Sequence, residues 1–170
     1  MLLEPILDNT DLHAVDPAWG TNDTDGHGTL TAGVAAYGDM LTSLAGSGHI
    51  LVRHRLESSK ILRSELQSNP KELWGHFTIQ GLSRAEIQAP NRKRIACMTV
   101  TSMETRDRGR PSAWSGAVDA LASGYDDSRR RLIIVSAGNT RDSGLWLNYP
   151  TGHRTSEVHD PGQAWNALTV

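Results

Sequence analysis

The stretch around His27 places a titratable side chain where it could carry out acid–base chemistry. His27 lies between Gly26 and Gly28, shortly after the carboxylates of Asp23 and Asp25 and just before a run of small residues. The glycines leave space around the imidazole, and an imidazole that changes its protonation state near neutral pH is the usual general base of an enzyme. The pattern indicates a candidate catalytic histidine; a histidine in a simple glycine turn is the alternative.

A second candidate is Asn139, which follows the apolar run 132–135 and the small residues Ser136, Ala137 and Gly138. A strand that ends in small residues would present the asparagine amide at the carboxyl edge of a sheet, where sites collect in α/β proteins. An amide N–H aimed from that edge can stabilise a developing oxyanion. A plain β-turn is the alternative, because glycine and asparagine are common turn residues.

Helices and parallel strands are predicted to position these two residues. Residues 29–37 are predicted to form a helix that Gly38 ends. A helix over 112–122 between two apolar strands makes a βαβ unit, which is typical of a parallel sheet covered by helices. Further helix starts are predicted at Asn69-Pro70 and at Ser83, and strands are predicted at 50–52, 61–62, 95–100, 132–135 and 167–170.

Together, the two motifs resemble those of the subtilisin-like serine peptidases, the subtilases. In that family a Gly-His-Gly-Thr motif at the head of a helix supplies the general base, and a strand that ends in Ser/Ala-Ala-Gly-Asn supplies the oxyanion asparagine. His27 and Asn139 match these positions, and the proline-containing loop and strand at 160–170 are also similar to the family. The resemblance spans 23–170.

The resemblance implies a three-layer α/β fold in which helices flank a mainly parallel central sheet. It also implies serine endopeptidase activity by an Asp-His-Ser triad, with His27 as the base and Asn139 as the oxyanion donor. The end of the strand that begins at Ile95 would border the substrate groove. The residues expected to bind substrate lie at two strand ends and are Ser102, Ser136 and Gly138.

The other two triad residues have no clear counterpart in this segment. Neither a Gly-Thr-Ser nucleophile motif nor a Gly-x-Ser-x-Gly elbow occurs, and Ser112 and Ser115 are interpreted as helix-start residues. Asp8 lies 19 residues before His27 and is not followed by the family's glycine, so a loop or capping aspartate is the better interpretation.

We expect 1–170 to be a single partial catalytic domain, truncated at both ends and inactive by itself, because the chain stops inside an apolar strand. Residues 55–92 are expected to be a family-specific insertion. The alternative of a different class is a protease-derived binding or scaffold module that kept the fold and lost catalysis.

The charge distribution weighs against a nucleic-acid partner. The net charge is −2, and residues 1–52 carry seven acidic residues and no lysine or arginine. A nucleic-acid-binding domain is usually basic overall, so the basic groups 92–94 and 129–131 are better interpreted as solvated starts of strands. We expect a polypeptide substrate as the partner, and self-association through exposed sheet edges.

The sequence predicts neither a membrane span nor a resident cofactor. No apolar run approaches the length of about 20 residues that spans a membrane, and no signal peptide occurs, so the cytoplasm is the expected compartment. No His-Glu-x-x-His or paired-cysteine spacing occurs, and Cys97 is expected to be a buried core residue. Calcium is the one metal considered, at Asp8, Asp11, Asp16, Asp23 and Asp25.

Overall fold

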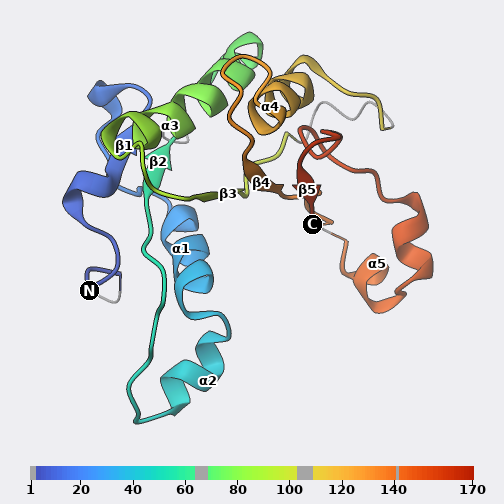
Figure 1. Cartoon of the computed structure of the whole chain (residues 1–170). Coiled ribbons are helices and arrows are strands. Elements are labelled where there is room, and N and C mark those ends of the chain that lie inside the picture. Colours follow the sequence, from blue (N-terminus) through green and yellow to red (C-terminus); the bar gives the residue numbers. More distant parts are fainter. Residues whose placement is uncertain (1–2, 64–68, 103–108, 141) are drawn as a thin grey trace. The chain divides into compact units, whose positions relative to one another are not determined.

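A computed structural model describes residues 3–63, 69–102, 109–140 and 142–170 (Figure 1). The described residues form helices and parallel sheets, which confirms the predicted α/β class. They group into two compact units, of which the first comprises Met1–Lys71 and Gln80–Arg92 and the second comprises Glu72–Ile79 and Lys93–Val170. The expectation of a single catalytic domain stays a prediction.

The helices and strands alternate along the chain. The first unit contains β1 (Leu12–Ala14), α1 (His27–Tyr37), α2 (Met40–Ala45) and β2 (Ser58–Lys60). The second unit contains β3 (Ile95–Met98), α4 (Ala113–Ser123), β4 (Leu132–Val135), α5 (Ser143–Leu147) and β5 (Leu168–Thr169). Helix α3 (Trp74–Gln88) contributes residues to both units. Short 3₁₀ helices lie at Asn9–Asp11, Pro17–Trp19, Lys71–Leu73 and Thr151–Thr155.

The second unit is built on a parallel sheet in the order β3-β4-β5. Met98 pairs with Val135, and Ile134 pairs with Leu168. Because side chains alternate across a strand, the face that carries Met98, Ile133 and Val135 is buried. The predicted strands at 95–100, 132–135 and 167–170 are confirmed within two residues at each end.

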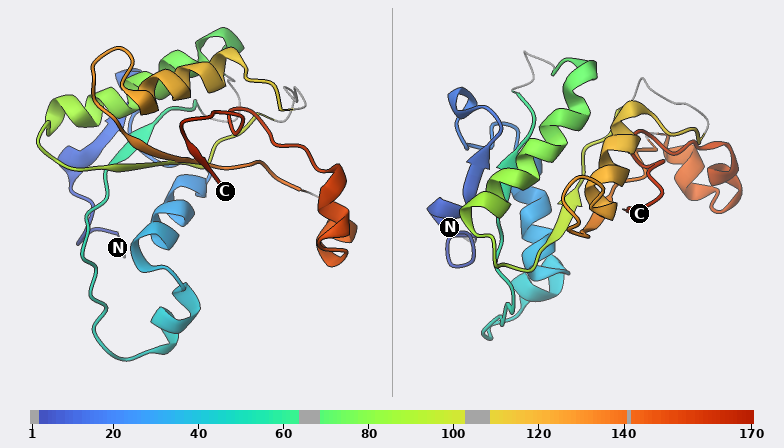
Figure 2. Two further views of the ribbon diagram at one scale, coloured as in Figure 1. Left: turned by 45° about the vertical axis from the view of Figure 1, so that its right-hand side comes forward. Right: turned by 45° about the horizontal axis from the view of Figure 1, so that its top comes forward.

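Helix α4 covers the buried face of this sheet, and its start at Ser112 follows the prediction. Ser112 is the N-cap, Gly124 is the C-cap, and Trp114, Val118 and Leu121 are buried along one side. The first turns of α3 lie beside α4 (Figure 2), with the rings of Trp74 and Trp114 centred 5.1 Å apart. The Trp114 indole N–H donates to the Thr78 hydroxyl at 2.9 Å, so the polar end of the buried ring is satisfied.

Cys97 is exposed, so the prediction that it is a buried core residue is wrong. The register explains the difference. Cys97 pairs with Ile134 and therefore lies on the opposite face of the strand from Met98. Ile95 and Leu132, which share that opposite face, are also exposed. An apolar run predicted the strand correctly but did not show which side of the sheet is covered.

The first unit contains a two-stranded parallel sheet, in which Ala14 of β1 pairs with Lys60 of β2. Strand β2 has the polar sequence Ser-Ser-Lys, which gives no strand signal. The strand predicted at the neighbouring apolar pair 61–62 is wrong, because these residues follow the end of β2. The predicted strand at 50–52 is also wrong, because this segment is an irregular stretch in which Ile50 and Leu51 are exposed.

Helix α3 is longer than predicted. The signal at Asn69-Pro70 leads into a 3₁₀ turn and then into α3, as expected, but the second predicted start at Ser83 lies inside the same helix. A helix that is already formed offers Ser83 a backbone carbonyl four residues earlier, so no cap is needed there. The later part of α3 is held to the first unit by the Arg84 side chain, which donates to the Val15 carbonyl at 2.6 Å.

Candidate active site

His27 is the first residue of α1, in the first unit, and its side chain is exposed. The helix starts two residues earlier than the predicted Thr29 and ends as predicted, with the Gly38 N–H donating to the Val34 carbonyl at 2.8 Å. The N-cap is Gly26, which has a φ of 85° and no side chain with which to cap the helix. The backbone N–H groups of the first turn must therefore find another acceptor.

Asp23 supplies that acceptor from outside the helix. One oxygen of its carboxylate, Oδ1, accepts the Gly26 N–H at 3.0 Å. The other, Oδ2, accepts both the Thr29 N–H at 2.7 Å and the Thr29 hydroxyl at 2.6 Å. The Thr29 hydroxyl and then these backbone donors hold the pKa of Asp23 well below its usual range, so Asp23 is ionised at neutral pH. A carboxylate at a helix N-terminus is also favoured by the helix dipole.

Asp25 contacts the main chain of the candidate base. Its Oδ1 accepts the backbone N–H of His27 at 2.9 Å. The two carboxylates before the histidine therefore fix the start of the helix, and through it the direction in which His27 leaves the backbone. At the other end of α1, the His54 Nε2 lies 3.0 Å from the Ala35 carbonyl oxygen.

Asn139 belongs to the second unit and lies beyond the carboxyl end of β4, where its side chain is exposed. Main-chain pairing continues past the end of the strand. The Ser136 N–H donates to the Met98 carbonyl at 3.1 Å, and the Ala137 N–H donates to the Val170 carbonyl at 2.7 Å. Main-chain bonds to the ends of both neighbouring strands therefore fix the backbone that leads to Asn139.

Gly138 makes the turn that precedes Asn139. Its φ is 118°, a conformation that L side chains rarely adopt, and its N–H donates to the Ser136 hydroxyl oxygen at 3.2 Å. A Cβ at position 138 would lie 2.5 Å from Cγ of His159, so the His159 ring packs directly against the Gly138 main chain. The His159 N–H also donates to the Ala137 carbonyl at 2.8 Å.

The three residues predicted to bind substrate lie in this turn or beyond the end of the neighbouring strand β3. Ser136 and Gly138 are half-buried, and Ser102 is buried beyond the end of β3. The Ser102 N–H donates to the Asp160 carbonyl at 2.8 Å. The second unit thus brings Ser102, Ser136, Gly138 and Asn139 to the carboxyl edge of one sheet. Their roles toward a substrate stay predictions.

Two residues that the sequence did not single out for function support this edge. His159 lies in a loop and is buried, and Asp160 is only 2% exposed. Both hydroxyls at the start of α4 donate to the Asp160 carboxylate. An Asp-Pro-Gly sequence is typical of a surface turn, so the sequence carried no signal that this carboxylate is buried.

Asp8 is a capping residue, as interpreted from the sequence. It is the N-cap of the 3₁₀ helix Asn9–Asp11, and its Oδ1 accepts the Thr10 N–H at 2.9 Å and the Thr10 hydroxyl at 2.8 Å. These bonds lower the pKa of Asp8 below its usual value. Nothing in this geometry assigns Asp8 to a triad.

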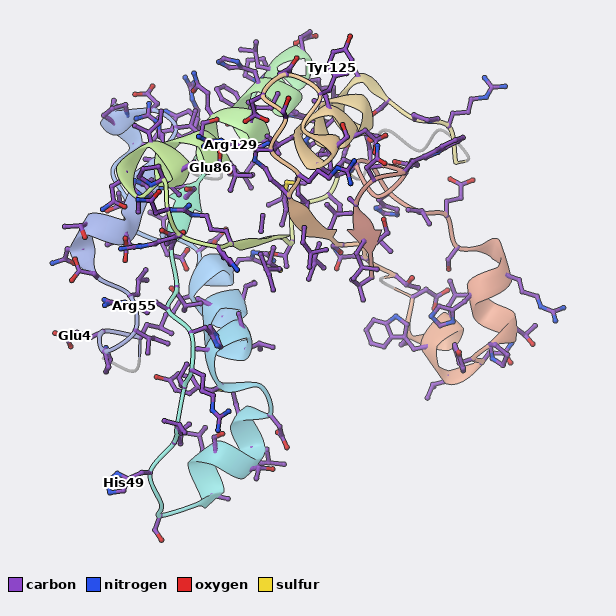
Figure 3. All side chains as sticks on the ribbon, in the orientation of Figure 1. Glu4, His49, Arg55, Glu86, Tyr125 and Arg129 are labelled. Carbon is purple, nitrogen blue, oxygen red and sulfur yellow. The ribbon has the colours of Figure 1, made fainter. Side chains whose placement is uncertain are left out.

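The acidic residues considered for calcium are engaged with the protein itself. Asp16 accepts the Ala18 N–H at 2.9 Å, and Asp11 is paired with Arg92 at 2.6 Å. Among the described residues, no group of three histidine, cysteine or acidic side chains is arranged to hold a metal ion. His49, for example, projects from the segment between α2 and β2 (Figure 3). The expectation of no resident cofactor, with calcium as the alternative, stays a prediction.

One arginine in each of the two basic groups has partners within the protein. Arg92 donates to Asp11 at 2.6 Å and to Glu57 at 2.7 Å. Arg131 donates to the Leu121 carbonyl at 3.0 Å and is paired with Asp127, whose pKa the guanidinium lowers to about 2. These arginines therefore tie loops to the elements beside them.

Among the described residues, no helix combines the length and the apolar character that a membrane span requires. No curated protein and no solved structure matches the chain. A family model described as the subtilase family, Peptidase S8, matches residues 2–170. The match covers nearly the whole chain and includes both motifs that carry His27 and Asn139. The chain therefore belongs to the subtilase family, whose members are serine-type peptidases.

Proposed function

We propose that this chain is the part of a serine endopeptidase that carries the general base and the oxyanion donor of its active site. The observation that carries the proposal is that the exposed side chains of His27 and Asn139 each extend from a backbone segment that is held by hydrogen bonds. His27 starts a helix that Asp23 caps, and Asn139 follows a turn that is fixed at Gly138. The family match supports hydrolysis of peptide bonds as the reaction.

In this mechanism His27 takes the proton of a serine hydroxyl while the serine oxygen attacks the carbonyl carbon of the peptide. The carbonyl oxygen becomes negatively charged, and the Asn139 amide donates a hydrogen bond to it. The protonated His27 then gives its proton to the leaving amine, and water hydrolyses the acyl-enzyme by the same steps. The exposure of both side chains leaves them accessible to a polypeptide.

The nucleophile and the aspartate that orients His27 are proposed to come from outside residues 1–170, because the sequence has no Gly-Thr-Ser motif and Asp8 caps a turn. We call the longer protein that supplies them the parent peptidase. The 170-residue chain alone is proposed to be inactive, because His27 then has no hydroxyl to activate.

The test is the kinetics of peptide hydrolysis by the parent peptidase and its variants. Asn139→Ala is expected to lower kcat by about 10²–10³ and to leave KM nearly unchanged, because the amide bonds most strongly to the oxyanion. That magnitude was measured in a subtilase and is carried over from the family. His27→Ala is expected to cost more, because it removes both the base and the acid.

A raised KM with an unchanged kcat in Asn139→Ala would assign this residue to ground-state binding and contradict the oxyanion role. A parent protein that binds polypeptides without hydrolysing them would support the alternative of a binding or scaffold module. Asp126→Asn is the control, because Asp126 is an exposed residue after α4, away from both motifs in the sequence.

A further inference from the structure

A buried carboxylate lies behind the turn that carries Asn139. The Oδ1 of Asp160 accepts a hydrogen bond from the Ser112 hydroxyl at 2.5 Å and a second from the Ser115 hydroxyl at 2.8 Å. Asp160 is 2% exposed and Ser115 is fully buried. A carboxylate is rarely buried without strong hydrogen bonds, and the mechanism above does not use this one as an acid or a base.

The hydroxyls of Ser112 and Ser115 lie next to each other as well as next to Asp160, with their oxygens 3.1 Å apart. Ser112 and Ser115 form a reciprocal capping box, in which each hydroxyl oxygen accepts the backbone N–H of the other residue at 3.0 to 3.2 Å. A hydroxyl has a single proton to donate, and for both serines the Asp160 carboxylate, at 2.5 and 2.8 Å, is a nearer and stronger acceptor than the other hydroxyl. The start of α4 therefore requires an acceptor at position 160, and α4 fixes the place of that acceptor.

The main chain on either side of Asp160 holds the catalytic edge of the sheet. The Asp160 carbonyl accepts the Ser102 N–H at 2.8 Å, beyond the end of β3. The preceding residue, His159, donates its N–H to the Ala137 carbonyl at 2.8 Å and packs its ring against Gly138. Each contact lies within the second unit.

We propose that Asp160 is a positioning residue for the oxyanion donor: held by Ser112 and Ser115, it fixes His159 against Gly138 and thereby sets the direction of the Asn139 amide. This inference rests on the proposed function of Asn139. It assigns to the start of α4 a role in the reaction, although neither serine touches the substrate. Asp160 acts through the turn and has no contact with the reacting atoms.

Removal of the Asp160 side chain should affect kcat more than KM. The main-chain bond from the Ser102 N–H to the Asp160 carbonyl does not depend on that side chain, so the strand end at Ser102 that would border the substrate stays in place. The direction of the Asn139 amide does depend on it, because the His159 ring would lose its anchored neighbour. A displacement of about 1 Å at a catalytic group can cost about 100-fold in rate.

The experiment is a double-mutant cycle in the parent peptidase with Asp160→Ala, Asn139→Ala and the double variant. Asp160→Ala is expected to lower kcat by about 10- to 100-fold with little change in KM. The double variant is expected to be no slower than Asn139→Ala alone, because a misdirected amide and a missing amide cause the same loss. Rate losses that multiply in the double variant would overturn the proposal.

A second variant, Asp160→Asn, keeps the proposal testable if Asp160→Ala does not fold. Its amide oxygen can still accept from both serine hydroxyls, so we expect it to keep more of the kcat than Asp160→Ala does. An Asp160→Asn variant as slow as Asp160→Ala would contradict a role that depends on the acceptor. The matched control is Asp127→Asn, which removes an exposed carboxylate beyond the other end of α4 and is expected to leave kcat unchanged.

Amide hydrogen exchange in the 170-residue chain separates this proposal from the proposed function. Asp160→Ala is expected to speed exchange of the His159 N–H, which bonds to the Ala137 carbonyl, whereas Asp127→Asn should not. Unchanged exchange at His159 would overturn the positioning role whatever the activity. A parent protein with no hydrolysis in any form, but with faster exchange at His159, would refute the peptidase function and leave the anchoring of the turn standing.

Discussion

Asp23 and Asp25 show how acidic residues can fix the position of a histidine by bonding to the main chain around it. Gly26 and Gly28 leave space around the side chain of His27, but the N-cap Gly26 has no side chain that could accept from the first-turn N–H groups. Asp23, which precedes the helix, accepts the N–H groups of Gly26 and Thr29 and so caps the first turn of α1 from outside. The motif thus combines an accessible imidazole with a fixed backbone.

The cap predicts a measurable loss of stability in Asp23→Asn. Asparagine keeps one acceptor oxygen, but its NH₂ group cannot accept the Thr29 N–H and hydroxyl that now bond to Oδ2. We expect the free energy of unfolding of the 170-residue chain to fall by about 1 kcal/mol at pH 7, as for other helix caps. Urea denaturation measures it, with Asp126→Asn as the charge-matched control.

The same cap has a defined pH dependence. The pKa of Asp23 is lowered in the folded chain from an unfolded value of about 3.9, so its ionised form stabilises the fold above about pH 4. This contribution is lost as the pH falls through the folded pKa. The stability difference between the wild type and Asp23→Asn should therefore be constant at neutral pH and shrink in acid. A difference that grows below pH 4 would contradict the assignment.

At the next level, the turn between β4 and the loop after it depends on one residue without a side chain. Gly138→Ala would place a Cβ 2.5 Å from the His159 ring and would hold alanine at a φ of 118°. We expect this variant to lower the free energy of unfolding by at least about 2 kcal/mol. Thermal or urea unfolding of the 170-residue chain measures the change.

Gly116→Ala is the matched control for that prediction. Gly116 lies in α4, and a Cβ built there meets nothing within 4 Å. Alanine is a better helix former than glycine, so this variant should gain about 0.5–1 kcal/mol. Equal effects of the two substitutions would show that the contact of Gly138 with His159 is not tight.

The elements that the sequence predicted well share a strong local signal. β4 is a continuous apolar run, and α4 has an apolar stripe that follows a serine at the helix start, so both were placed within one residue. β2 is polar, and its pairing with β1 is set by contacts distant in the sequence, which local patterns do not report. The helix start predicted at Ser83 was wrong because a capping sequence can also occur inside a helix, and the local pattern does not distinguish the two cases.

The candidate site was predicted in the same uneven way. His27 and Asn139 were found because short motifs carry them. Asp160 was missed because its importance depends on burial beneath α4 and on two serines 45 and 48 residues earlier in the chain. Burial of a polar side chain is a property of tertiary packing, and a turn-like sequence gives no sign of it.

For the chain as a whole, the sheet β3-β4-β5 predicts self-association. β3 and β5 are the outer strands of this three-stranded sheet, and exposed strand edges can pair with another chain. Ile95 and Leu168 also place exposed apolar side chains on these strands. We expect the 170-residue chain to dimerise or aggregate as its concentration rises. Sedimentation that shows only monomer at high concentration would contradict this expectation.

The proposed division of the active site between this chain and the rest of the parent peptidase can be tested by covalent labelling with an organophosphonate probe of activated serines. We expect the parent peptidase to be labelled, its His27→Ala variant to be labelled far more slowly, and the 170-residue chain to take no label. Labelling of Ser112 or Ser115 in the isolated chain, or an unchanged labelling rate in His27→Ala, would contradict the assignment of His27 as the general base of a serine outside this segment.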